Sequence, residues 1–495
     1  MQTDVIVVGA GPTGLVLANE LALAGTRVVV LEKQPVRSTQ SRAGALQPRT
    51  AEVLDLRGWL EPLLERALPR GRFGGHFAGL PVELDCRPWQ TRYPYPVAIP
   101  QARLEAFLEQ RLVAQGIGVL RGYEVSAVQQ DAGGVAAGDI HGRYLVACDG
   151  GHSTVRKLLG VPFPGSAGTM SAVVADITLA AMSADVPSQS GHFSRHIKSR
   201  GGLFSVLSPI EGGLYRLMFG SRAGREAMDR EAPVAAEEVR DALRTAYPGT
   251  ELGELRAASR FSNATRQVER YREGRVFFAG DAAHIHLPVG GQGVNLGVQD
   301  AFNLGWKLAA AVRGWAPSGL LDSYHAERHP VAARVLHNTR AQGVLTNPSQ
   351  DENLGALRDI VTDLLRLPDA NRYVSGMISG LDVQYPGLGP RLIDFDLTTR
   401  DGPTRASRLM RTGRGLLLSL DGKPRSIAGW ADRVDHVSAA ADAAVGAMLV
   451  RPDGYIAWSA TDAHPLETAL ARWFGEAAAA SPPLPVRADA DLLCR

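Results

Sequence analysis

The first 32 residues place the strongest constraint on the fold of this chain. An apolar run at 4–8 (DVIVV) leads into the glycine-rich sequence GAGPTG at 9–14, and a helical pattern then continues through Leu23. A second apolar run at 27–31 ends at the acidic residue Glu32. A buried parallel strand, a glycine turn, a helix and a strand-end carboxylate in this order are typical of a dinucleotide-binding unit. The sequence therefore predicts an α/β fold with a Rossmann-type domain.

Each glycine of this turn has a separate expected role. Gly9 permits the tight turn, Gly11 lets the backbone approach a pyrophosphate, and Gly14 lets the helix pack on the strand. Glu32 stands where a carboxylate accepts a hydrogen bond from a ribose hydroxyl, and it would repel a 2′-phosphate. The nucleotide bound here is therefore expected to be FAD or NAD and not NADP. The predicted contacts are Gly9, Gly11, Pro12, Thr13, Gly14, Glu32 and Lys33.

The segment 275–300 (RVFFAGDAAHIHLPVGGQGVNLGVQD) narrows the nucleotide to a flavin. A strand is expected at 276–279, and Gly280 then turns the backbone and leaves Asp281 at the strand's carboxyl end, where it could accept from a ribityl hydroxyl. The run Gly290–Gly293 precedes an apolar-periodic helix at 294–312, and free amides at a helix N-terminus attract negative charge. A reduced flavin carries such charge near N1 and the C2 carbonyl. The predicted contacts are Asp281, Gly290, Gly291, Gly293, Val294 and Asn295.

Two further segments are expected to reach the nucleotide crevice. The polar loop 41–50 precedes a helix at 51–56, and its Arg42 could neutralise the pyrophosphate or approach the flavin ring; a solvated loop arginine is the alternative. An amphipathic helix is expected to begin at Pro100, with Leu104, Phe107, Leu108 and Leu112 on its buried face. Gln101 and Arg103 then stand in its first turn, either close to the cofactor or simply exposed.

A third strand-to-helix junction follows at 144–156 (YLVACDGGHSTVR). Asp149 and Gly150 occupy the turn, and Ser153 or Thr154 is expected to cap the helix. Asp149 could order the cofactor or a bound arginine, and an ordinary turn and cap is the alternative.

Between these segments the pattern changes to short strands, at 172–179, 202–207 and 214–219, separated by glycine and proline turns. This pattern predicts an antiparallel sheet that covers the flavin and forms a substrate domain, joined by the aromatic-rich segment 73–97. The aromatic residues that could line its pocket, with core packing as the alternative, are Phe73, Phe77, Trp89, Tyr93, Tyr95, Phe204 and Tyr215.

Composition bounds the remaining possibilities. A chain of 495 residues is expected to form two or three domains, and 53 basic against 51 acidic residues give no general attraction to nucleic acid. Three scattered cysteines, Cys86, Cys148 and Cys494, are too few for a disulfide framework or a cysteine metal site. No stretch is apolar and long enough to cross a bilayer, and no basic leader opens the chain. A soluble cytoplasmic protein is expected.

The histidines do not predict a metal centre. His284 and His286 alternate and His325 and His329 are four apart, but no carboxylate or cysteine cluster completes a ligand set. Ser38 and Ser41 lack the context of a hydrolase nucleophile. We therefore expect no metal, and the residues alone assign no catalytic acid or base.

Taken together, these motifs resemble the class A flavoprotein monooxygenases of the para-hydroxybenzoate hydroxylase fold, and in particular the hydroxylases of aromatic polyketides such as angucyclines and anthracyclines. The resemblance rests on GAGPTG at 9–14, Asp149 with Gly150, and GDAAHIHLP at 280–288, together with FGGHFAGL at 73–80, NATRQ at 263–267 and NLGWK at 303–307. It implies FAD contacts from Glu32, Arg42, Gln101, Arg103 and Asp281. It also places Pro288 and the amides of 290–295 beside the flavin ring.

The resemblance implies a domain organisation as well. The FAD domain is expected to combine 1–72, 98–170 and 268–345, and the substrate domain 73–97 and 171–267. A helical connection at 346–390, with breaks at Pro348 and Pro368, leads to a thioredoxin-like domain at 391–495. Two strands are expected there, within 416–419 and 447–458. That domain lacks the Cys-x-x-Cys motif, so a packing or dimer-supporting role is expected.

The activity implied by the resemblance is hydroxylation of a polycyclic aromatic polyketide. NADPH or NADH would reduce FAD, molecular oxygen would add at flavin C4a as a hydroperoxide, and the electron-rich ring would attack it. Baeyer-Villiger insertion or oxidative rearrangement of a quinone, a flavin-dependent oxidase or dehydrogenase, and a non-enzymatic FAD-binding regulator stay open as alternatives. The substrate, the ring position, the nicotinamide and the choice between monomer and homodimer are not determined by the sequence.

Overall fold

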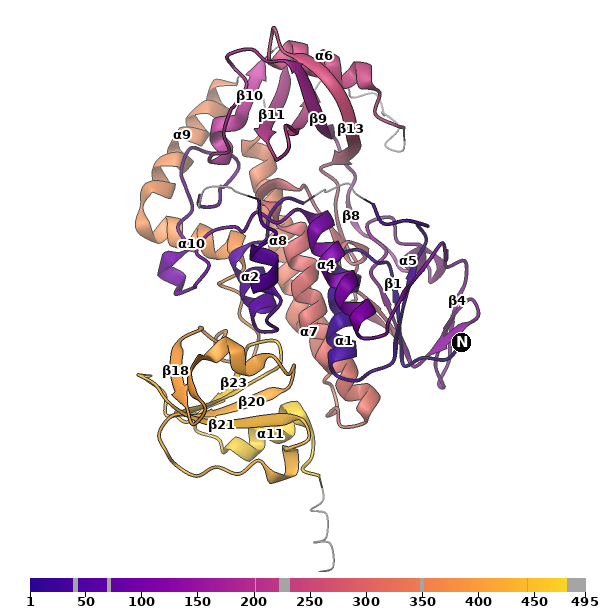
Figure 1. The fold of residues 1–495 in the computed structure, drawn as a ribbon, viewed down its shortest axis with the longest axis vertical. Coiled ribbons are helices and arrows are strands. Elements are labelled where there is room, and N and C mark those ends of the chain that lie inside the picture. Colours follow the sequence, from indigo (N-terminus) through magenta and orange to yellow (C-terminus); the bar gives the residue numbers. More distant parts are fainter. Residues whose placement is uncertain are drawn as a thin grey trace, which may run out of the picture.

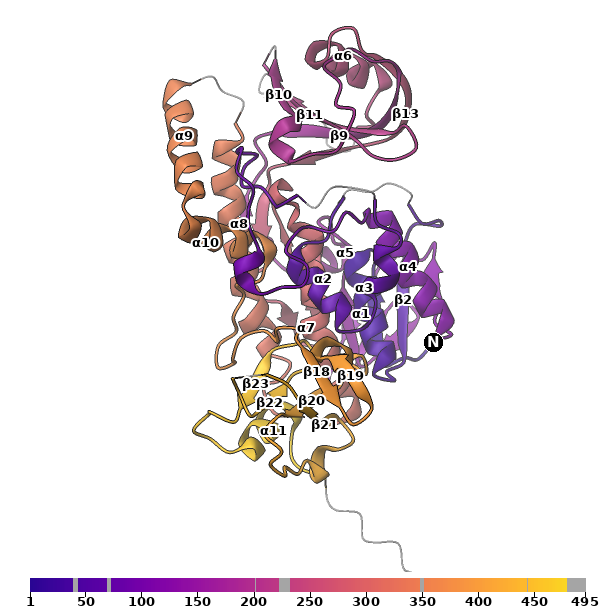
Figure 2. The same cartoon turned by 60° about the vertical axis from the view of Figure 1, so that its left-hand side comes forward.

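The computed structural model describes residues 1–38, 43–68, 73–200, 202–221, 232–347, 351–442 and 444–478. Its domains form three layers along the long axis of the molecule (Figure 1). A mixed α/β domain occupies the middle, an antiparallel sheet with one covering helix lies at one end, and the C-terminal domain lies at the other. The same order is visible after rotation (Figure 2).

The middle layer is built on a six-stranded sheet in the order β15-β16-β7-β1-β2-β3. Its strands β16, β7, β1, β2 and β3 are parallel neighbours, and the short β15 adds an antiparallel edge. The apolar runs of β1 and β16 are fully buried, which is typical of strands covered on both faces. This confirms the predicted Rossmann-type sheet. The bounds are β1 Val5–Val8, β2 Val28–Glu32, β3 Val119–Arg121, β7 Tyr144–Ala147, β15 Arg272–Glu273 and β16 Val276–Phe278.

Helices cover this sheet, and a small antiparallel sheet (β4 Val128–Gln130, β5 Val135–Ala137, β6 Ile140–Gly142) flanks it. The predicted buried face of α4 is confirmed, since Leu104, Phe107, Leu108 and Leu112 are all buried. The predicted cap of α5 is Ser153, whose hydroxyl accepts from the Arg156 amide at 3.1 Å. The bounds are α1 Pro12–Leu23, α2 Pro48–Asp55, α3 Leu60–Leu64, α4 Gln101–Ala114, α5 Thr154–Leu158 and α7 Gly293–Arg313.

The second layer is an antiparallel sheet in the order β10-β11-β12-β9-β13, as predicted. Alternate side chains such as Val173, Leu207 and Leu217 form a buried cluster with Leu243 of helix α6 on the outer face. The inner face is turned toward the middle layer. The bounds are β9 Ser171–Ala181, β10 Ile197–Arg200, β11 Leu203–Pro209, β12 Tyr215–Ser221, β13 Glu251–Ser262 and α6 Ala236–Ala246. A three-stranded sheet lies between the two layers: β17 His284–Ile285, β14 Thr265–Gln267 and β8 Gly165–Ser166.

Three helices form one side of the molecule: α8 Ser323–Leu345, α9 Glu352–Arg366 and α10 Pro368–Ser379. The predicted break at Pro368 coincides with the first residue of α10. The amide at the first position of a helix has no partner within the helix, so a proline there removes no hydrogen bond. Pro348 lies outside the described residues. The segment 73–97 packs on these helices, because Leu80 and Leu84 form one apolar cluster with Leu365.

The C-terminal domain has a mixed sheet in the order β19-β18-β21-β20-β22-β23. The parallel pair β20 and β21 lies beside the antiparallel β22 and β23, which agrees with the predicted thioredoxin-like fold. The predicted strands correspond to β20, β22 and β23. The bounds are β18 Asp396–Thr399, β19 Gly402–Arg405, β20 Gly415–Ser419, β21 Val434–Ala440, β22 Ala447–Val450, β23 Ile456–Ser459 and α11 Leu466–Phe474.

A buried ion cluster joins the C-terminal domain to the middle layer. Glu327 of α8 accepts from Lys307 of α7 at 2.8 Å and from Arg451, which follows β22, at 2.7 Å. Arg451 also pairs with Asp453, and its side chain is fully buried. Burial lowers the pKa of Lys307 to about 8, against the opposing effect of Glu327. Because these charges compensate one another, loss of one partner would leave an uncompensated charge in the interior.

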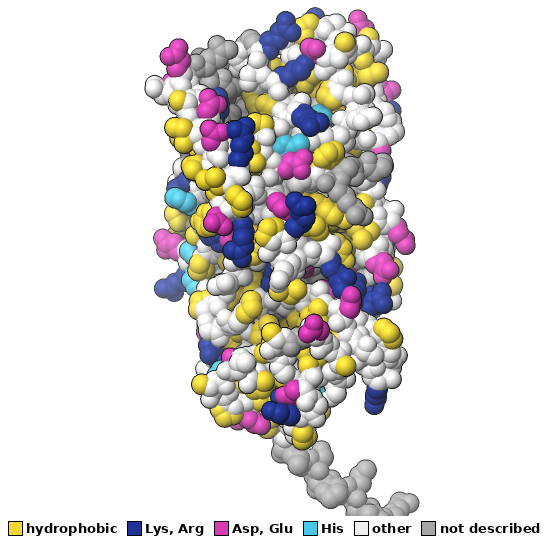
Figure 3. Space-filling view, turned by 90° about the vertical axis from the view of Figure 1, so that its left-hand side faces the viewer, with side chains coloured by type: hydrophobic (Ala, Val, Ile, Leu, Met, Phe, Trp, Pro, Cys, Tyr) yellow, Lys and Arg dark blue, Asp and Glu magenta, His cyan; other side chains and the backbone are white. Residues whose placement is uncertain are grey.

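Surface charge is mixed on the face that Figure 3 shows, where basic and acidic side chains alternate without a single-sign patch. In the described part of the chain, no helix has both the length and the apolar character required to cross a membrane.

We expect Arg451→Met to lower the free energy of unfolding by about 3–5 kcal/mol, because it leaves Glu327 buried without its main partner. Urea unfolding followed by tryptophan fluorescence measures this change. Arg400→Met is the matched control, since Arg400 lies in the same domain with a 92% exposed side chain. Equal unfolding midpoints for the two variants would contradict the assigned role of the cluster.

Candidate functional site

A large cavity of about 1500 Å³ lies between the middle layer and the antiparallel sheet. Its lower wall is formed where four parallel strands end, with Gly9 after β1, Glu32 at the end of β2, Asp149 after β7 and Asp281 after β16. Its upper wall includes Phe204 and other side chains of the sheet. The carboxyl ends of parallel strands are the usual ligand-binding edge of an open α/β sheet.

The glycine turn has the shape required for a bound pyrophosphate. Gly9 has φ +105°, and a β-carbon placed there would be 2.4 Å from the Cys148 carbonyl oxygen. A β-carbon at Gly14 would be 2.0 Å from the Gly9 oxygen, so both positions exclude a side chain for packing reasons. Gly11 differs, because a β-carbon there meets nothing within 4 Å and the residue lines the cavity. The open side of Gly11 fits the predicted approach of a phosphate.

Glu32 is fixed at the end of β2 by backbone amides. One carboxylate oxygen accepts from the Ala10 amide at 2.9 Å and the other from the Gln34 amide at 2.9 Å. Each oxygen keeps a second lone pair for a ribose hydroxyl. Pro12, Thr13 and the exposed Lys33 also line the cavity at this end.

Asp149 offers an acceptor that the described protein leaves unused. One oxygen accepts from the Val155 amide at 3.1 Å, while the other is buried without a hydrogen-bond partner among the described residues. Burial raises the pKa of this carboxyl. A buried polar atom without a partner is costly, and a cofactor hydroxyl would satisfy it. This fits the predicted role of Asp149 toward FAD.

The structure separates the two predicted residues at the start of α4. Gln101 lines the cavity, and its side chain binds the Ala43 amide at 3.3 Å and Glu105 at 2.8 Å. Arg103 lies outside the lining, and its predicted contact with FAD stays a prediction. Its guanidinium donates to the Arg66 carbonyl oxygen at 2.6 Å and pairs with Glu211 of the upper layer, so its charge is used between domains.

The predicted flavin end of the cavity is formed by Asp281, Pro288 and the start of α7. Gly290 and Gly291 have φ of +75° and +62°, and together with Gly293 and Val294 they line the cavity. Their contacts with the ring stay predictions. Arg42, also predicted to lie beside the ring, falls outside the described residues.

Asn295, also predicted to contact the cofactor, has its side chain bound within the protein. Its amide oxygen accepts from the Gln47 amide at 2.7 Å, its amide nitrogen donates to the Gly291 oxygen at 2.7 Å, and the side chain is buried outside the lining. Asn295 therefore holds the loop before α2 against the N-terminus of α7. This role depends on contacts between distant segments, which no local motif could have indicated.

Of the seven aromatic residues predicted near the substrate, Phe73 and Phe204 line the cavity. The other five pack or bind elsewhere. Phe77 joins the apolar cluster of α8–α10, and Tyr93 and Tyr95 pack against the core of the middle layer. The Trp89 indole donates to the Arg372 carbonyl oxygen at 3.0 Å. The Tyr215 hydroxyl contacts the Met182 sulfur. These five residues find their apolar or polar partners outside the cavity lining.

Sequence reasoning missed a second aromatic group at the cavity. His76 stacks on Phe193 with ring centroids 4.1 Å apart, and His192 contacts the Gly75 oxygen at 3.3 Å. Burial lowers the pKa of His76 to about 3, so this ring is neutral at ordinary pH. The stack joins segment 73–76 to the upper layer, although its two partners are more than a hundred residues apart in the sequence. The motif FGGH at 73–76 was the only local sequence feature that pointed to this contact.

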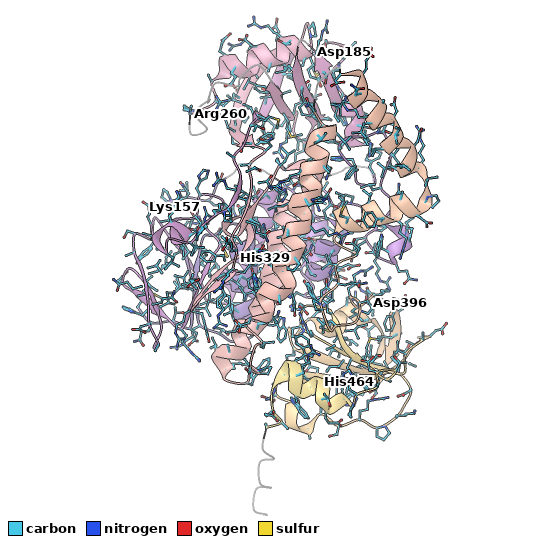
Figure 4. The ribbon with its side chains drawn as sticks, turned by 180° about the vertical axis from the view of Figure 1, so that it is seen from behind. Lys157, Asp185, Arg260, His329, Asp396 and His464 are labelled. Carbon is cyan, nitrogen blue, oxygen red and sulfur yellow. The ribbon has the colours of Figure 1, made fainter. Side chains whose placement is uncertain are left out.

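Of the four histidines in the paired spacings, His286 lines the cavity and the other three bond or pack within the middle layer. His284 bonds to Asp300 at 2.7 Å, while His325 and His329 pack against Tyr271. Figure 4 shows His329 in the middle layer, with Arg260 above it and His464 below. Across the described ranges, no group of three His, Cys, Asp or Glu residues is arranged to hold a metal ion.

We expect Gly11→Ala and Gly14→Ala to have opposite consequences. Gly11→Ala should leave the thermal unfolding of the apoprotein unchanged but weaken FAD binding by about tenfold or more, about 1.4 kcal/mol, because its methyl group enters the phosphate path. Gly14→Ala should destabilise the apoprotein by about 1–3 kcal/mol through its clash with Gly9. Apoprotein melting and FAD fluorescence titration separate the two. Unchanged FAD affinity in Gly11→Ala would contradict this site.

Comparison with known proteins agrees with this geometry. Residues 2–339 match the family described as FAD binding domain, and residues 385–477 match the family described as aromatic-ring hydroxylase, C-terminal. The chain is 45% identical to a 12-dehydrotetracycline 5-monooxygenase/anhydrotetracycline 6-monooxygenase of Streptomyces rimosus, and 45% identical to a rifampicin monooxygenase of Streptomyces venezuelae. Each match covers 96% of this chain and 99% of the relative.

A solved structure extends the likeness to the whole fold. CabE, an aromatic hydroxylase from angucycline biosynthesis, superposes with a TM-score of 0.85 at 38% identity, and the match covers 96% of this chain and 100% of that one. The family match to most of the chain, the shared fold and the cavity at the glycine turn lead to one assignment. The chain belongs to the FAD-dependent aromatic-ring hydroxylases and is a flavin-dependent monooxygenase.

Proposed function

We propose that this monooxygenase hydroxylates a polycyclic aromatic polyketide, with NADPH or NADH as reductant and molecular oxygen as co-substrate. The observation that carries the proposal is the single cavity that the nucleotide-binding turn and the inner face of the antiparallel sheet share. The names of the relatives, which refer to tetracycline precursors, rifampicin and angucyclines, support a large polycyclic substrate. The size of the cavity supports it too, since a cofactor and a polycyclic compound need space together.

FAD, when bound, supplies the redox chemistry by accepting hydride and transferring oxygen to the substrate. The protein's own residues bind and orient. Gly11 and the N-terminus of α1 would hold the pyrophosphate, Glu32 a ribose hydroxyl, and Asp149 and Asp281 further hydroxyls. Pro288 and the amides of 290–294 would lie beside the ring, and Arg42 would act as its counter-charge.

The upper wall would then position the substrate and exclude water from the ring. Phe204 and Phe73 provide apolar surface, and the His76–Phe193 stack lines the cavity between the layers. Water exclusion protects a reactive oxygen donor from unproductive breakdown. We further propose that the enzyme works in the cytoplasm as a monomer or homodimer, which size-exclusion chromatography with light scattering would resolve.

We expect the purified protein to carry FAD that heat denaturation releases, and to oxidise NADPH or NADH faster in the presence of an aromatic polyketide phenol. Anhydrotetracycline is the first probe, followed by rifampicin and an angucycline. Absorbance at 340 nm measures oxidation, and mass spectrometry should find one added oxygen atom.

Product structure by NMR separates hydroxylation from Baeyer-Villiger insertion, because both add the same mass. A flavin-dependent oxidase would instead turn over without any nicotinamide. Failure of the protein to bind FAD after reconstitution, or nicotinamide oxidation that no polyketide in the panel accelerates, would contradict the proposed function.

A further inference from the structure

The inner face of the antiparallel sheet is graded from apolar to charged. Alternation along β12 buries Leu217 and Phe219 against α6, so Arg216 and Met218 point to the cavity, which both of them line. Strand register places Met218 directly opposite Val174 of β9. It places Arg216 opposite Ser208 of β11 on one side and Asp176 of β9 on the other.

Arg216 is held in a fixed orientation by Asp176. Its Nε donates to one carboxylate oxygen at 2.8 Å and its Nη2 donates to the other at 2.9 Å. Both side chains are mostly buried, with 16% and 17% exposed. A bidentate pair of this kind fixes the plane of the guanidinium and leaves Nη1 as an edge that none of the described residues uses.

That unused edge is directed to the flavin side of the cavity. A β-carbon placed on Gly44 would be 3.7 Å from Arg216 Nη1, and Gly44 also lines the cavity. Gly44 belongs to the loop that Gln47 fastens to the predicted flavin end, through a 2.9 Å bond from the Gln47 amide to the Gly290 oxygen. Arg216 therefore reaches from the substrate sheet toward the place where the ring of FAD is expected.

We propose that Arg216, braced by Asp176, binds an ionised phenol or enol oxygen of the substrate and sets which edge of the polycycle faces the flavin. The apolar part of the sheet, around Met218 and Val174, would hold the rings, and Ser208 lies beside Arg216 as a second polar group. The phenol would bind as its phenolate, with its proton released to solvent. Arg216 is thus a positioning residue for a phenolic substrate.

The contact between Arg216 and the phenol oxygen would favour hydroxylation itself. A phenolate is more electron-rich than a phenol, and oxygen transfer from a flavin requires an electron-rich ring. A guanidinium in a partly buried site favours the ionised form and so lowers the pKa of the bound phenol. This inference rests on the proposed function, because it assigns a subsite within the same cavity.

The test uses the FAD-loaded full-length enzyme and 1,2-dihydroxyanthraquinone, a tricyclic phenol whose colour changes when it ionises. Its dimethyl ether serves as the non-ionising analogue. Arg216→Gln and Arg216→Lys are compared with wild type. Arg256→Gln is the matched control, since Arg256 lies on β13 of the same sheet, 60% exposed and outside the cavity lining. Spectral titration over pH gives the affinity of each ligand and the ionisation midpoint of the bound phenol.

We expect wild type and Arg256→Gln to lower that midpoint below its value in free solution. Arg216→Gln should lose the lowering and bind the dihydroxy compound about tenfold more weakly, with unchanged affinity for the dimethyl ether. Arg216→Lys should restore part of the lowering, because it keeps the charge and loses the fork. A change confined to folding would affect both ligands equally and would move no ionisation midpoint.

Several results would overturn the inference. They are an unchanged midpoint in Arg216→Gln, equal losses for the two ligands, loss of FAD in place of loss of ligand, or failure of wild type to bind the dihydroxy compound. None of these results contradicts the proposed function if polyketides still accelerate NADPH oxidation. Conversely, a wild-type enzyme that binds and ionises the probe through Arg216 but never oxidises NADPH would contradict the function and leave the subsite standing.

Discussion

The cofactor end of the structure depends on the hydrogen bonds that the buried carboxylate of Asp300 accepts. It accepts from the Gly280 amide at 3.1 Å, from His284 at 2.7 Å and from Arg328 at 2.7 Å, and it is fully buried. Burial alone would raise the pKa of Asp300, but Arg328 and His284 outweigh burial and the pKa is lowered. Since Asp300 lies on α7, Gly280 after β16 and Arg328 on α8, this single group fixes the strand-end turn against two helices. The position of Asp281 follows from that attachment.

Helix α7 carries this order through the molecule. Its N-terminus lines the cavity, Gly297 and Gly305 allow close contact with Thr13 and Glu20 of α1, and Lys307 near its other end enters the ion cluster of the C-terminal domain. A β-carbon at Gly297 would be 2.3 Å from the Thr13 hydroxyl, so the glycine is required for that contact. The C-terminal domain therefore supports the cavity by fixing the helix whose first turn forms part of its wall.

Sequence predicted those parts of the fold and site that are specified within one strand-turn-helix unit. The strands β1, β2 and β16, the glycine turn and the buried face of α4 follow from local periodicity and turn chemistry. Asn295 was predicted as a cofactor contact from its position after the glycine run, and Arg103 from its position and the family resemblance; in the structure their side chains bind Gln47 and Glu211. Five of the seven predicted pocket aromatics lie outside the cavity lining for the same reason, since an aromatic residue packs equally well in core or pocket. Arg216 was missed because its partner Asp176 lies forty residues away and meets it only through strand register.

The shared cavity determines how water can be excluded from the reacting flavin. Both walls line one continuous space, from Gly11 at the nucleotide end to Met218 on the sheet. A reacting flavin would therefore be shielded from water by what fills that space and by the closeness of the two layers. The ion pair between Arg103 and Glu211 and the stack of His76 on Phe193 join those layers at two separate places. A polycyclic substrate seated on the sheet would complete the enclosure, so occupation of the subsite and protection of the flavin are consequences of one binding event.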